Sequence, residues 1–148
     1  MGLWDWSQAA YAQPGVAEAC LRLQDAHGQN ISFLLWSVWS ETDDRALLAR
    51  GAELARRWEA LALLPLRGVR RALKAEADGV PDVAREALRQ DIKAAELRAE
   101  RVLLESLEAL GARTHAGAPP LQVLTAASAA WNPVAPDAAL AALAAAFG

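Results

Sequence analysis

The most apolar stretch of the chain is a short run in its first third. Between Ile31 and Trp39 seven of nine residues are large and apolar, and at helical periodicity they cover every side of a helix. Such a helix has to be enclosed by other elements, and this one is shorter than the about 20 apolar residues that cross a membrane. Asn30 before it and Thr42 after it are residues that favour helix N-caps. The pattern predicts a capped, buried central helix over 31–39.

Apolar residues at spacings of three and four predict helices on both sides of this run. Upstream, Val16, Cys20 and Leu23 form such a stripe. Downstream, a second stripe has five members, Leu47, Gly51, Leu54, Trp58 and Leu61. A glycine within a helical stripe costs about 1 kcal/mol against alanine, so we expect another helix to approach closely at Gly51. Pro65 should end or kink this helix near Leu64.

A turn at 78–81 precedes the longest predicted helix, 81–110. Its predicted inward stripe is Leu88, Ile92, Ala95, Ala99, Val102, Leu103 and Leu110. The charged positions, Arg85, Arg89 and Glu96 among them, are assigned to a solvated outer face. About 30 residues at 1.5 Å each make about 45 Å, which can exceed the rest of the domain. An overhanging end would offer a seam for a homodimer.

The last quarter of the chain is rich in alanine. A loop is expected over 112–120, with short helices over 121–131 and 138–147. We expect 1–110 to form a helical core domain and 111–148 to be a loop and alanine-rich helices packed on the same domain. The 148 residues thus predict an all-α protein, a single compact domain of six to eight helices around the helix 31–39.

Charge adds one candidate contact surface. The net charge is −3, but the segment from Arg50 to Lys74 carries +5. Four cations, Arg67, Arg70, Arg71 and Lys74, stand at relative positions zero, three, four and seven, which places them on one side of a helix. Such a face can meet an acidic protein, nucleic-acid phosphates or a small anion, or it can be an ordinary solvated surface.

Chemistry that would identify an enzyme is not found in the sequence. One cysteine and two histidines do not make a metal-ligand cluster, and no phosphate-binding loop, dinucleotide fingerprint or nucleophile elbow occurs. We therefore assign no catalytic residue, metal or cofactor. The six tryptophans either fill the core or line a pocket. A lone cysteine and the lack of a signal-peptide pattern favour the cytoplasm, with no membrane contact.

Three segments near the N-terminus resemble a known family: 3–7 (LWDWS), 11–16 (YAQPGV) and 23–28 (LQDAHG). The later Leu34-Leu35-Trp36, Trp58 and the segment 65–74 are similar to it as well. The family comprises uncharacterised proteobacterial proteins and is catalogued as domain of unknown function number 2390. The resemblance covers about residues 3–110. It implies a bacterial, cytoplasmic helical protein and brings no activity, cofactor or catalytic residue.

Three functions remain open from the sequence. The first is a non-enzymatic protein-interaction or regulatory module that contacts an unknown protein partner through Arg67, Arg70, Arg71 and Lys74. The second is nucleic-acid or anion binding through the same face, 67–74. The third is a small enzyme with a tryptophan-lined helical pocket, for which no reaction can be named.

Overall fold

The computed structural model describes residues 1–111 and 117–147, and this part of the chain is helical, without strands. It contains eight α-helices, which confirms the all-α prediction. They are α1 (Leu3–Tyr11), α2 (Val16–His27), α3 (Ile31–Ser40), α4 (Arg45–Trp58), α5 (Leu64–Ala72), α6 (Asp82–Leu110), α7 (Pro120–Trp131) and α8 (Asp137–Ala144). A π-helical segment, Glu59–Leu63, joins α4 to α5, and a 3₁₀ turn, Ala145–Phe147, follows α8.

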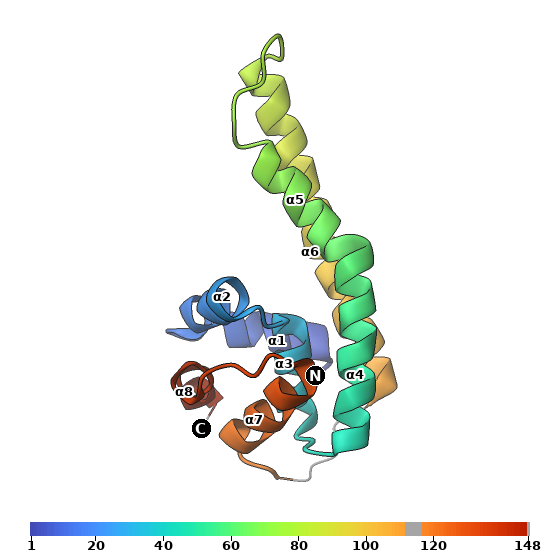
Figure 1. Ribbon diagram of the computed structural model, residues 1–148, viewed down its shortest axis with the longest axis vertical. Helices are drawn as coiled ribbons and strands as arrows, with labels where there is room; N and C mark the ends of the chain where they lie inside the picture. Colours follow the sequence, from blue (N-terminus) through green and yellow to red (C-terminus); the bar gives the residue numbers. More distant parts are fainter. Residues whose placement is uncertain (112–116, 148) are drawn as a thin grey trace.

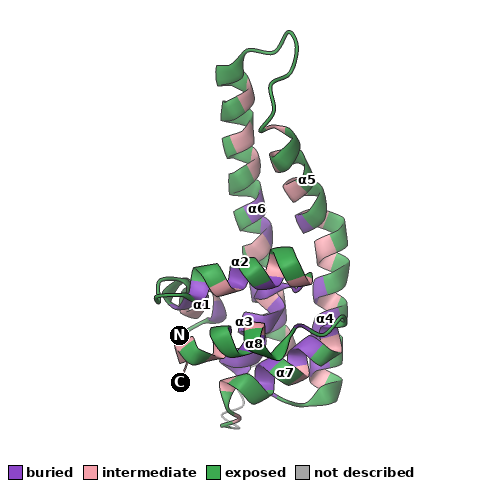
Figure 2. Cartoon of the chain, turned by 60° about the vertical axis from the view of Figure 1, so that its left-hand side comes forward, coloured by how far each residue is buried: buried purple, intermediate pink, exposed green. Residues whose placement is uncertain are grey.

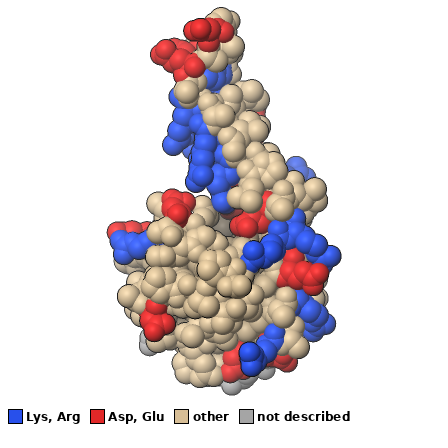
Figure 3. Space-filling model, in the orientation of Figure 1, with Lys and Arg blue, Asp and Glu red and all other residues tan. Residues whose placement is uncertain are grey.

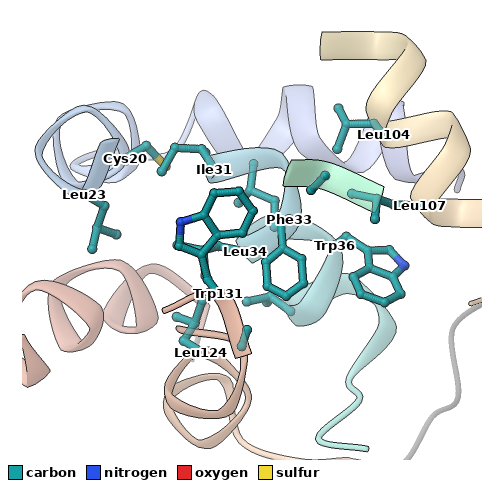
Figure 4. Packing of buried hydrophobic residues seen from close by; sticks show 14 of the residues in the cluster. Cys20, Leu23, Ile31, Phe33, Leu34, Trp36, Leu104, Leu107, Leu124 and Trp131 are labelled. Atoms are coloured by element: carbon teal, nitrogen blue, oxygen red, sulfur yellow. The ribbon is translucent and has the colours of Figure 1, made fainter. Parts of the chain in front are cut away.

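Helix α3 is the centre of the molecule, as its apolar pattern predicts. Every residue of α3 except Ser32 is buried. The side chain of Asn30 accepts a hydrogen bond of 3.0 Å from the backbone N–H of Phe33, which confirms the predicted N-cap. Figure 4 shows Phe33 and Trp36 of α3 between side chains of α6 and α7. The central helix is therefore enclosed by helices that come from both halves of the chain.

The helices divide into a body and a projecting arm (Figure 1). α1, α2, α7 and α8 gather around α3, with α4 and the C-terminal half of α6 along one side. α5 and the N-terminal half of α6 continue beyond the body as an antiparallel pair. We call this pair the arm. The expected overhang of the long helix is present, and α5 accompanies it.

The joint between α4 and α5 differs from a simple end or kink at Pro65. α4 ends at Trp58, five π-helical residues follow, and Pro65 lies in the first turn of α5. Proline lacks the N–H that an uninterrupted α-helix would use, and the first turn of a helix tolerates that loss. The wider π turn therefore takes up the interruption and lets the chain continue into the arm.

The polarity of the arm is inverted relative to the prediction. Arg85, Arg89 and Glu96 turn toward α5 and are half-buried or buried, whereas Leu88 is 48% exposed and Val83 84%. The predicted inward stripe is thus wrong at Leu88, and also at Ala95 and Val102, which are exposed. It holds at Ala99 and Leu103, where α6 reaches the body. In the arm α6 has only α5 to pack against, and arginine stems supply that contact.

The alanine-rich C-terminal helices pack onto the body. Leu124 and Trp131 of α7, with Leu140 and Leu143 of α8, are buried against the central cluster. The loop expected over 112–120 lies partly outside the described residues. The N-cap predicted at Thr42 is Asp44 instead, whose carboxylate accepts the N–H groups of two residues of α4. Thr42 is buried and accepts the N–H of Asp44.

Within residues 1–111 and 117–147, no helix combines the length and the apolar character that a bilayer crossing requires.

Candidate interaction surface

The basic stripe predicted from the sequence lies on α5, and half of it is occupied by one carboxylate. Glu96 of α6 receives Arg70 Nε at 2.6 Å on Oε2 and Arg67 Nε at 3.4 Å on Oε1. Glu96 is only 8% exposed. A buried carboxylate between two guanidinium groups holds the two helices of the arm together. Arg67 and Arg70 are thus committed first to the fold of the arm.

Arg71 and Lys74 are the more accessible half of the stripe. Arg71 makes one loose ion pair with Asp25 of α2, at 3.7 Å, between side chains that are both about half exposed. Lys74 is exposed and has no ion-pair partner in the described part of the chain. Figure 3 shows basic side chains along the side of the arm that overlooks α2, and acidic ones at the tip of the arm. The structure thus places all four predicted cations on α5 and just beyond it, in two different roles.

A polar recess lies below this basic side, where the arm meets the C-terminal end of α2. Its outer part has a volume of about 300 Å³ and is lined by the ion-paired Arg71 and Asp25 together with Gln24, Glu59 and Arg67. An inner part of about 20 Å³ shares the last three of these residues and reaches Glu100. Its volume is about that of one water molecule. The recess therefore brings amides, carboxyls and guanidinium groups together at the base of the arm.

Burial raises the pKa of two carboxyl groups at the inner recess. It raises the pKa of Glu59, against the hydrogen bond from Asn30, and it raises the pKa of Glu100, where nearby Glu96 adds to the effect. Cys20 lies against the Tyr11 hydroxyl, and burial raises the pKa of its thiol to about 11. Cys20 is also only 2% exposed, and both features are typical of a packed core residue.

Glu100→Gln tests the electrostatics of the recess. A carboxyl whose folded pKa is raised favours folding below its unfolded value, near 4.5, and loses that contribution as pH rises through the folded pKa. We therefore expect Glu100→Gln to raise the melting temperature at pH 7, by an amount that shrinks as pH falls toward 4.5. Thermal unfolding across this pH range measures it.

The exposed Glu76, in the connection between α5 and α6, provides the matched control. Glu76→Gln should leave the melting temperature nearly unchanged at both ends of the pH range. A Glu100→Gln protein that melts below wild type at pH 7 would contradict a net unfavourable burial of this carboxyl.

The tryptophans are mainly structural. The indole N–H groups of Trp36, Trp58 and Trp131 each donate to a backbone carbonyl, at 2.8 to 3.0 Å, so these rings are fixed in the core. Trp6 and Trp39 line a hollow of about 440 Å³ beside Phe147. Glu41 also lines it and accepts the N–H of Gly117 at 3.2 Å. Trp36, Trp58 and Trp131 thus pack in the core, Trp6 lines the hollow, and Trp39, which is 6% exposed, does both.

Among residues 1–111 and 117–147, no three histidine, cysteine or acidic side chains lie close enough to hold a metal ion together. Gln24 and Glu59 were not singled out from the sequence, and Glu96 was assigned to the solvated outer face of the predicted long helix. The inward position of Glu96 could be predicted from its spacing. It is four residues after Ile92 and three before Ala99, which places it on the same helix face as these two apolar residues.

These observations define an all-α protein with a helical body, a projecting two-helix arm and a polar recess between them. The chain belongs to the family described as protein of unknown function, DUF2390, whose model matches residues 2–107. The match covers α1 to α5 and most of α6, so it includes the whole arm and leaves out α7 and α8. No curated protein and no solved structure matches the chain.

Proposed function

We propose that this protein is a non-enzymatic interaction module of the cytoplasm that binds a protein partner with its arm. The observation that carries the proposal is the basic side of the projecting arm, where Arg71 and Lys74 are exposed while the neighbouring Arg67 and Arg70 are paired with the buried Glu96. Exposed like charges on a projecting element favour contact with a surface of opposite charge. The buried free thiol of Cys20 is in keeping with a reducing compartment.

The basic side of the arm favours an acidic protein surface as the partner. Arg71 and Lys74 are the contact residues, because they are exposed and weakly held. Arg67, Arg70 and Glu96 together add one positive charge behind them. The carboxyls of Glu59 and Glu100, close to the same guanidinium groups, reduce its effect. When a partner binds, the exposed ion pair between Arg71 and Asp25 is exchanged for another exposed ion pair. The free-energy cost of breaking it is therefore small.

The test is a co-purification with identification of proteins by mass spectrometry. We expect Arg71→Glu with Lys74→Glu to lose partners that wild type retains, because two attractive contacts become repulsive. Arg45→Glu with Arg50→Glu is the matched control: both residues are exposed on α4, and neither makes an ion pair in the described part of the chain. Partners that stay with the arm variant and leave the control would overturn the proposal.

Nucleic-acid binding through the same face is the second candidate, supported by the exposure of Arg71 and Lys74. Two accessible cations neutralise about two phosphates, so affinity for duplex DNA would fall with salt at a logarithmic slope of about −1.8. Titration of duplex DNA and single-stranded RNA at several salt concentrations decides between the candidates. Salt-dependent binding that Arg71→Glu with Lys74→Glu abolishes would replace the protein partner by a nucleic acid.

A further inference from the structure

The outer face of α6, directed away from α5, is an extended surface that no other described helix covers in the arm. Arg85 and Glu96 contact α5, so residues half a helical turn away from them lie on the opposite side. Leu97 is 52% exposed there and Val102 39%. Figure 2 shows the outer side of α6 exposed along the length of the arm. This face is distinct from the basic side of α5.

The outer face has a hollow near the body. It has a volume of about 490 Å³, and its lining includes Leu97, Val102 and, from α1, Trp4. The guanidinium carbon of Arg101 lies 5.0 Å from the centre of the Trp4 ring, and Arg101 Nε donates to Glu105 at 2.9 Å. Apolar side chains thus lie in a hollow bordered by a fixed ion pair. It is shaped to receive an apolar side chain from another helix.

Two opposite charges lie on the same face and are exposed. Asp91 and Arg98 are exposed, and neither forms an ion pair within the described residues. They are seven residues apart, which is about two helical turns, so they lie on one side of α6. Their midpoint falls between Ala94 and Ala95, whose small side chains permit close approach of a second helix.

We propose that a second copy of this chain docks here, with its α6 antiparallel to the first and a twofold axis passing between Ala94 and Ala95. That arrangement places Asp91 opposite Arg98 of the second copy, and does so twice because a twofold interface is self-complementary. It also brings Leu88 of the second copy to the level of Arg101 and Val102, at the hollow. A parallel arrangement would set like charges opposite each other, so the charges select the antiparallel one.

The size of the seam sets the strength of the dimer. With this axis, residues 82–107 of the two helices overlap, which is about 39 Å at 1.5 Å per residue. A seam of one helix from each copy is at the small end of specific protein interfaces. The dimer is therefore reversible, and its population depends on protein concentration.

Sedimentation velocity of the full chain across a concentration series tests this dimer. Wild type is expected to pass from monomer to dimer. Asp91→Arg alone and Arg98→Asp alone should each weaken self-association by about tenfold or more, because each sets like charges opposite one another. A mixture of these two variants should form a heterodimer, since Arg at 91 then faces Asp at 98 of the other chain. The double variant should recover self-association.

Circular dichroism establishes that each variant keeps its helical content, which the exposed positions of both residues favour. Arg50→Asp on α4 is the matched control and should dimerise like wild type. Arg71→Glu with Lys74→Glu should also dimerise, so the dimer and the proposed partner binding fail or succeed separately. Wild type that remains monomeric throughout overturns the proposal. Dimerisation that neither single charge reversal weakens overturns it equally, because the interface would lie elsewhere.

Discussion

Gly51→Ala is expected to destabilise the protein by about 2 kcal/mol or more, although alanine normally stabilises a helix by about 1 kcal/mol relative to glycine. A Cβ atom at position 51 would stand 2.4 Å from Cζ3 and 2.9 Å from Cη2 of Trp36. These separations are far inside van der Waals contact, so the indole ring or α4 would have to move. Thermal or denaturant unfolding measures the loss, which corresponds to about 4–8 °C in a domain of this size.

Trp36 has little room to yield. The ring is fully buried, and its Nε1 donates to the carbonyl of Gly111 at 3.0 Å. A Cβ at Gly111 would itself lie 3.1 Å from the same ring, so glycines bound the indole on two sides. Rotating the ring away from position 51 would break the Nε1 bond and open a void beside Phe33, whose ring centre lies 5.9 Å away.

Gly68→Ala is the matched control. Gly68 also lies inside a helix, α5, but a Cβ there meets nothing within 4 Å. Alanine at 68 should therefore stabilise the protein by about 0.5–1 kcal/mol. The loss caused by Gly51→Ala should also shrink in a Trp36→Phe background, where the ring is smaller. A Gly51→Ala protein as stable as the Gly68→Ala protein would contradict the close packing of α4 on α3.

The contact at Gly51 and the central helix could both be predicted from the sequence because each follows from one local rule. An all-round apolar run between residues that favour N-caps has to be buried, and α3 is buried. A glycine in the apolar row of α4 indicates that another element comes close, and the indole of Trp36 is that element. In both cases the burial pattern along one helix was sufficient.

The arm could not be predicted in the same way. Periodicity assigns apolar residues to the inside, but α6 leaves the body and has only α5 as a neighbour in the arm. There Arg85 donates to the carbonyl of Leu73, and its stem fills space that a leucine would fill in a larger core. The Nε of Arg89 is buried and lacks a hydrogen-bond partner among the described residues, so this packing is imperfect.

The basic stripe shows that the sequence of one helix does not identify the groups that face it in the fold. Spacing correctly predicts that Arg67, Arg70 and Arg71 share a side of α5, but it carries no information about what faces them. Glu96 is 26 residues from Arg70 along the chain, and only the pairing of α5 with α6 brings the two together. Charges that look available in a sequence can thus be neutralised by a distant residue.

Glu96→Gln is expected to loosen the arm by about 2–4 kcal/mol while leaving the body intact. Removing one partner of a buried ion pair costs about 3–5 kcal/mol, and partial access to water at Arg70 reduces that figure here. Glutamine keeps the volume of glutamate, so the loss reports the missing charge and not a cavity. The loss of stability affects α5, because Arg67 and Arg70 would then be half-buried beside a neutral group.

Hydrogen exchange followed by mass spectrometry separates this local loosening from global unfolding. Amides of α5 and of the distal half of α6 should exchange faster in Glu96→Gln, while those of α3 keep their protection. Glu105→Gln, nine residues further along α6, is the matched control. It removes an ion pair with Arg101 in which both side chains are about half exposed, and such pairs contribute about 0–1 kcal/mol. Equal exchange in α5 of the two variants would contradict the role of Glu96 in holding α5 against α6.

Replacing Arg67, Arg70 and Glu96 together distinguishes what these three charges contribute to the stability of the arm from what they contribute to partner binding. Arg67→Met, Arg70→Leu and Glu96→Leu together should restore or raise the stability of the arm, since apolar groups of similar size avoid the cost of removing charges from water. The same triple variant leaves Arg71 and Lys74 in place but removes the positive potential behind them. A triple variant that protects α5 from exchange and yet binds the partner more weakly would show that the charges of Arg67, Arg70 and Glu96 serve recognition. The arm would then be less stable than an apolar one because it keeps a basic surface on a projecting helix.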